Sequence, residues 1–163
     1  MRRLTGGDRE FDEDGRLAAA GTADPELVAG WLDDPFFAEP PPRSTGRERF
    51  GAPRVTAWLE EHPGLSAEDA VATLTEVTAR SIADSYELIG FEIDEVLLCG
   101  GGARNPEIRR RLADRLAGAR VGTLDEVGWS ADAREAAAFA LLARQHVLGH
   151  AVDLTWATGA AGP

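Results

Sequence analysis

The residues best suited to chemistry are three consecutive glycines, Gly100, Gly101 and Gly102. Glycine adopts positive φ values freely and, without a Cβ, lets a ligand approach the backbone where another residue would clash. Asn105 and Pro106 follow and form a good helix start, with Asn as the N-cap and Pro at the first helical position. Open α/β sheets bind nucleotides at helix starts of this kind. The pattern therefore indicates a candidate nucleotide-binding turn.

Two common glycine-rich motifs do not fit this turn. A dinucleotide fingerprint needs glycine at its first, third and sixth positions, and Asn105 occupies the sixth when counting starts at Gly100. A P-loop needs lysine, and the chain has none, because its 17 basic residues are all arginine. A tight strand-to-helix turn without a ligand therefore stays open as an alternative for the triple glycine on its own.

The elements that must position these residues alternate between strand and helix. We expect strands at residues 93–99 and 120–123, and helices at residues 106–116 and 133–148. The first strand contains a continuous apolar run, which suits a parallel strand buried on both faces. The β-α-β-α order implies parallel strands joined by a right-handed crossover. These signals predict an α/β fold that is rich in helix and has a small parallel sheet.

The preceding part of the chain is less regular. We expect a short helix at residues 25–32 and an extended, proline-rich stretch at residues 39–48, because three prolines block helix. A long helix follows, beginning with a capping-box pattern at Ser66 and Asp69 and stopping near Gly90. We interpret residues 1–163 as one partial domain, with an irregular and helical insert at 1–65 and the glycine-turn portion at 66–163.

Composition narrows the class of protein. The net charge of −11 disfavours binding to nucleic acid and to anionic membranes, because both would repel this surface. No apolar stretch resembles a signal peptide or a membrane span, so cytoplasmic is the default expectation. Cys99 is the only cysteine, which rules out an internal disulfide framework and predicts a buried filler. The two expected strands make a marginal sheet, which favours a chain that belongs to a larger one.

Five blocks of the sequence resemble, in order, those of the anhydro-N-acetylmuramic acid kinases. The blocks are residues 34–37, 41–48, 72–79, 98–106 and 135–143. Each is weak alone, but together they cover nearly the whole chain from about residue 30. The resemblance implies a partial ribonuclease-H-like C-terminal lobe of the actin-like sugar kinase and Hsp70 fold. It also implies a kinase that consumes ATP, Mg2+ and water, and converts 1,6-anhydro-N-acetylmuramic acid to N-acetylmuramic acid 6-phosphate in cell-wall recycling.

The resemblance also assigns roles to individual residues, and the sequence departs from the family pattern near one of them. Gly100, Gly101 and Gly102 would lie against the adenosine of ATP, and Asn105 would help hold the turn or the nucleoside. Glu135 would hydrogen-bond the sugar or the water, although an ordinary first-turn glutamate remains the alternative. Ala131 stands where the family usually has glycine.

The family's phosphate loop and water-activating aspartate would precede this chain, so the resemblance predicts no turnover by the chain alone. Activity would need the N-terminal portion or a partner chain, and a homodimer is possible. The alternatives are a non-catalytic remnant, a split-enzyme subunit that binds nucleotide only with its partner, and an unrelated small α/β nucleotide-binding module.

Other residues carry weaker signals. Arg47 could bind a phosphate or sugar carboxylate through its guanidinium fork, or pair with a structural neighbour. His146 and His150 have a spacing compatible with zinc, but no third ligand is evident, so we expect no metal site. We interpret the tryptophans as core or interface anchors. They are Trp31, Trp58, Trp129 and Trp156.

Overall fold

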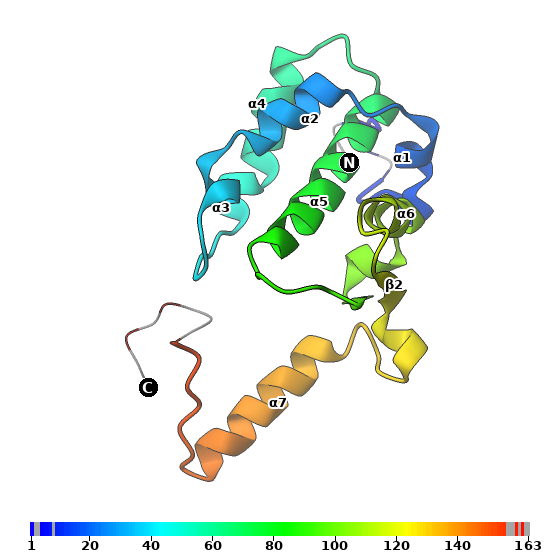
Figure 1. Cartoon of the computed structure of the whole chain (residues 1–163). Coiled ribbons are helices and arrows are strands. Elements are labelled where there is room, and N and C mark those ends of the chain that lie inside the picture. Colours follow the sequence, from blue (N-terminus) through cyan, green and yellow to red (C-terminus); the bar gives the residue numbers. More distant parts are fainter. Residues whose placement is uncertain (2–3, 8, 156–158, 160, 162–163) are drawn as a thin grey trace.

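The computed structural model of the chain describes residues 1, 4–7, 9–155, 159 and 161. Helices dominate this part of the chain, and a single small sheet accompanies them (Figure 1). The elements, in order, are η1 (Glu13–Gly15), α1 (Arg16–Ala20), α2 (Pro25–Leu32), η2 (Pro35–Ala38), α3 (Arg47–Phe50), α4 (Ala52–Glu61), α5 (Ala67–Glu87), β1 (Glu95–Leu98), η3 (Gly101–Arg104), α6 (Pro106–Arg115), β2 (Arg120–Thr123), η4 (Leu124–Val127) and α7 (Arg134–Val147). Among the described residues, no helix has the length and apolar character needed to cross a bilayer.

The sheet consists of β1 and β2, which run parallel. Val96 pairs with Val121 and Leu98 with Thr123, and α6 forms the crossover between the two strands. The predicted α/β class, with much helix and a small parallel sheet, is confirmed. The first strand is shorter than expected, because pairing is confined to residues 95–98. Cys99 just beyond it is half-buried, so the prediction of a buried filler holds only in part.

The long helix α5 is the centre of the fold, with α1, α2 and α6 packed around it (Figure 1). Ser66 caps it as predicted, accepting a hydrogen bond from the N–H of Asp69 at 3.0 Å. The reciprocal half of the predicted capping box is not formed. The Asp69 carboxylate instead accepts from the Ser66 hydroxyl and from the N–H of Thr22, 47 positions earlier. A local sequence pattern cannot reveal such a distant donor.

The first 65 residues build a core against α5. Trp31 of α2 and Trp58 of α4 are buried and meet edge to face, with ring centroids 5.8 Å apart. Both therefore act as the predicted core anchors. Trp129, in contrast, is 63% exposed, and Trp156 lies outside the described residues. Helix α4 has no counterpart among the predicted helices, because it lacks a side-chain cap and follows the proline-rich stretch.

The proline-rich stretch is irregular as far as Gly46, two residues before the expected end, because α3 begins at Arg47. Arginines fix this region. The Nη1 of Arg43 donates to the carbonyls of Phe36 and Phe37 at 2.6 and 2.8 Å. Asp34 pairs with Arg49 at 2.5 Å and with Arg54 at 2.6 Å. These contacts hold the segment against the aromatic core without regular secondary structure.

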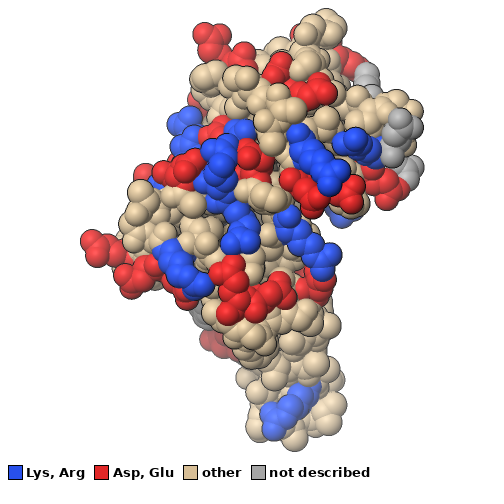
Figure 2. Space-filling model, turned by 90° about the vertical axis from the view of Figure 1, so that its right-hand side faces the viewer, with Lys and Arg blue, Asp and Glu red and all other residues tan. Residues whose placement is uncertain are grey.

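A buried arginine joins α6 to the rest of the molecule. Arg111 donates to the carboxylate of Glu76 in α5 at 2.6 Å, and to that of Glu107 at 3.3 Å. It also reaches the carbonyl of Ala18 in α1 at 3.4 Å. On the face that Figure 2 shows, arginines and carboxylates are interleaved rather than segregated. The negative net charge therefore does not gather into one acidic patch on this face.

Candidate functional site

The glycine turn follows the carboxyl end of β1, as the sequence predicts. Gly100 has φ 74° and ψ −171°, a conformation essentially restricted to glycine. Its N–H donates to the carbonyl of Ala131 at 3.1 Å. The ion pair between Arg104 and Asp132 joins the same two segments. The turn and the loop that precedes α7 therefore form one unit at this end of the sheet.

The turn is open on its outer side. A Cβ placed on Gly100 or Gly101 would meet no heavy atom within 4 Å, and one on Gly102 would just touch Ile108 at 4.0 Å. Gly101 and Gly102 are exposed, and among the described residues their backbone N–H groups have no hydrogen-bond partner. Packing within the chain thus does not explain why all three positions are glycine. The open side leaves room and two donors for a ligand.

Asn105 is the N-cap of α6, as predicted. Its Oδ1 accepts hydrogen bonds from the N–H groups of Glu107 at 3.0 Å and Ile108 at 3.3 Å. A Cβ on Gly15 would lie 2.5 Å from this oxygen, so η1 packs closely against the cap. The Oδ1 atom is therefore committed to the helix start, and only the Nδ2 group is left for a nucleoside.

Glu135 lies in the first turn of α7, and its side chain is 79% exposed. Its Oε1 pairs with the guanidinium of the adjacent Arg134 at 3.5 Å. Among the described residues, no hydrogen bond or ion pair connects it to the glycine turn. Ala131, which stands where the family usually has glycine, is buried and does not have a positive φ. The loop therefore accepts its side chain without backbone strain.

Arg47 and the histidines complete the predicted candidates. Arg47 is exposed, and its side chain forms no ion pair or hydrogen bond with the described residues. Its neighbours Arg43, Arg49 and Arg54 make the structural contacts of this segment instead. In the part of the chain that the structure describes, no three potential metal ligands gather.

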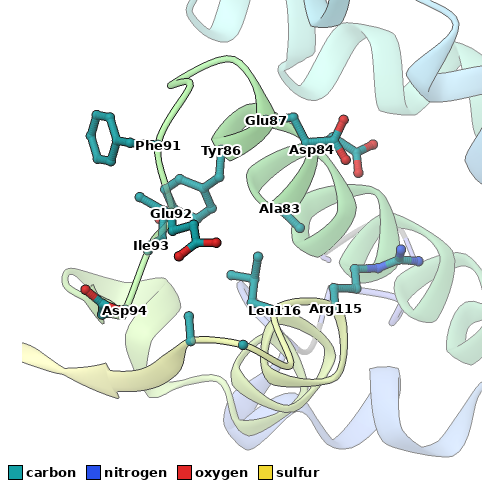
Figure 3. A pocket seen from close by; sticks show the side chains of 12 residues that line it. Ala83, Asp84, Tyr86, Glu87, Phe91, Glu92, Ile93, Asp94, Arg115 and Leu116 are labelled. Carbon is teal, nitrogen blue, oxygen red and sulfur yellow. The ribbon is translucent and has the colours of Figure 1, made fainter.

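A hollow of about 640 Å³ lies elsewhere (Figure 3). It is bounded by the end of α5, residues 91–94 and the turn before β2, so it faces the amino ends of the strands. Tyr86, Phe91 and Leu116 form its apolar wall, with four carboxylates at the rim. No sequence motif pointed to it. Ligands of open α/β sheets bind at the carboxyl ends, which favours the glycine turn as the site.

Comparison with known proteins identifies the family. A sequence profile described as anhydro-N-acetylmuramic acid kinase matches residues 2–163. Over 151 residues the chain is 49% identical to the protein of that name from Gloeobacter violaceus, covering 92% of this chain and 40% of that protein. The Streptomyces coelicolor protein of that name is 42% identical over 160 residues, which cover 98% of this chain and 40% of that protein. The chain thus spans about two-fifths of the length of these relatives. It belongs to the anhydro-N-acetylmuramic acid kinase family.

Proposed function

We propose that the chain is the nucleotide-side portion of an ATP-dependent kinase that acts on 1,6-anhydro-N-acetylmuramic acid. In this proposal the enzyme opens the anhydro ring and phosphorylates the sugar to N-acetylmuramic acid 6-phosphate, as the resemblance implies. The lobe would be ribonuclease-H-like, and the substrates would be ATP with Mg2+, the anhydro sugar and water. The observation that carries the proposal is an open glycine turn, at the carboxyl end of a parallel strand, in a member of this family.

The resemblance suggests the proposed roles, and the geometry supports them. Gly101 and Gly102 would let the adenosine lie against the backbone, and their N–H groups would be available to it. Asn105 would hold the start of α6 so that the turn keeps its shape. Glu135, a solvent-facing carboxylate, would accept a hydrogen bond from the sugar or the attacking water. The contact between Gly100 and Ala131 would link these two parts of the site.

Phosphoryl transfer depends mainly on positioning and on electrostatic stabilisation of the transferred group. Mg2+ would arrive with the ATP phosphates and neutralise part of their charge. Because the resemblance places the phosphate loop and the water-activating aspartate outside these 163 residues, we propose that the chain alone does not turn over. ADP release coupled to the anhydro sugar tests this point, and clear turnover by the purified chain would contradict it.

The nucleotide site is tested by calorimetric titration of the chain with Mg-ATP and Mg-ADP, comparing the original chain with Gly101→Val. A valine at this position fills open space, so it should leave the fold intact while obstructing the nucleotide. We expect binding that Gly101→Val removes. Equal affinity in both proteins would exclude the turn as the site. A folded chain that binds neither nucleotide would favour the remnant or split-enzyme alternative.

A further inference from the structure

Helix α7 lacks the contacts that its sequence requires. Residues 136–143 are eight consecutive apolar residues, so apolar side chains point in every direction around more than two helical turns. A helix that is apolar all round is normally buried in the core of a protein. Nevertheless, no described residue of α7 is buried, and Phe139 is 71% and Leu141 61% exposed. The helix projects from the remaining fold (Figure 1), and its end of the molecule carries few charges on the face in Figure 2.

The sheet is incomplete at one edge. The carbonyl of Asp94 accepts a hydrogen bond from the N–H of Arg120 at 2.8 Å, so the peptide groups of Asp94 face β2. Peptide groups alternate sides along a strand, and those of Glu95 and Leu97 therefore point to the opposite edge. No strand within the described part of the chain pairs there. Parallel strands normally occur in larger sheets that are covered on both faces.

We infer that the surface formed by α7 and the free edge of β1 binds the remaining portion of the kinase. That portion is the part of each relative, more than half of its length, to which this chain does not align. It must present a strand to the β1 edge and apolar side chains to several sides of α7. A second copy of this chain is a poorer occupant, because a two-fold interface covers one face of a helix and leaves the others exposed.

This inference rests on the family assignment and does not depend on the proposed nucleotide site. Hydrogen exchange followed by mass spectrometry tests it on two whole proteins, this chain and the full-length Gloeobacter violaceus kinase. Light scattering sets the concentration at which this chain is monomeric. We expect the segment 134–148 to exchange about 100-fold faster in this chain than the aligned segment does in the full-length kinase. The α5 segment, residues 67–87, is the internal control and should be protected in both.

Two outcomes would overturn the inference. Rapid exchange of the aligned helix in the full-length kinase would show that nothing covers it there. Slow exchange of residues 134–148 in this chain would show that the helix is already covered. At higher concentration, where light scattering shows association, protection of this segment that Phe139→Asp removes would identify a second copy as the occupant instead. Phe11→Asp is the matched control, because Phe11 is similarly exposed, at 67%, but lies far from α7 in the chain.

Discussion

At the scale of single residues, the glycine turn contains two kinds of glycine. Gly100 is required by its backbone conformation, whereas Gly101 has an ordinary φ and open space around it. The sequence pattern predicts the turn but cannot separate these roles, because both depend on three-dimensional geometry. The distinction is useful, since a glycine that neither backbone conformation nor packing calls for is what close ligand approach would explain.

A pair of alanine substitutions should separate the two roles. Gly100→Ala should reduce the free energy of unfolding by about 1–3 kcal/mol, because its φ and ψ are strained for any residue with a Cβ. Gly101→Ala should change it by less than about 1 kcal/mol. Urea denaturation of both variants measures the difference. Equal losses would mean that the turn adopts another conformation in solution.

The carboxylate of Glu76 should make stability depend on pH. Burial tends to raise the pKa of Glu76, but hydrogen bonds from Arg115 and Arg111 outweigh this effect and lower it from its ordinary value of 4.5. A carboxyl whose pKa is lower in the folded state contributes stability above its unfolded pKa. That contribution is lost as the pH falls from about 4.5 through the folded value.

Glu76→Gln should therefore lower the free energy of unfolding by about 1–3 kcal/mol at pH 7, and by progressively less below pH 4.5. Urea titrations at several pH values measure this trend. Glu92→Gln is the control, because Glu92 is exposed and forms no ion pair with the described residues. A Glu76→Gln loss that does not shrink in acid would indicate a packing effect rather than the ion pairs.

At the scale of elements, local sequence signals were sufficient to predict the bounds of several helices and strands. Helix α2 and strand β2 have the predicted bounds, α6 ends one residue early, and α7 is one residue shorter than predicted at each end. Proline, N-caps and apolar runs mark these elements in the sequence itself. The burial of Arg111 could not be predicted, because its partner Glu76 is 35 positions away. The arrangement of the predicted site residues could not be predicted for the same reason, since no local pattern shows whether Glu135 faces the glycine turn.

Two matched helix caps can test whether Asn105 does more than begin α6. Asp24 before Pro25 and Asn105 before Pro106 each accept hydrogen bonds from the next two free backbone N–H groups of their helices. Each alanine substitution should lower the free energy of unfolding by about 1 kcal/mol. Only Asn105→Ala should also weaken Mg-ADP binding in calorimetry, because only that cap adjoins the glycine turn. Equal nucleotide affinities would restrict Asn105 to its structural role.

At the scale of the whole molecule, the apolar core is divided and uneven. One cluster contains Trp31 and Trp58 beside the first half of α5, and the other is built from Ala79, Ala83 and Leu112 beside the second half. The second cluster supports the sheet and the glycine turn with much smaller buried side chains. The weaker cluster is thus the one that packs against a sheet of only two strands in the described part of the chain.

The exposed helix should govern aggregation without contributing much to stability. Phe139 and Leu142 are 71% and 39% exposed on α7, so replacing both by aspartate should leave the melting temperature within about 2 °C of the original. The same change should suppress aggregation on heating, since exposed apolar patches drive association. Calorimetric melting and light scattering on the same samples measure the two effects, with Phe11→Asp as the exposed control. A fall of more than about 5 °C would show that α7 packs against the fold in solution, because a loss of about 1 kcal/mol shifts the melting temperature of a domain this size by a few degrees.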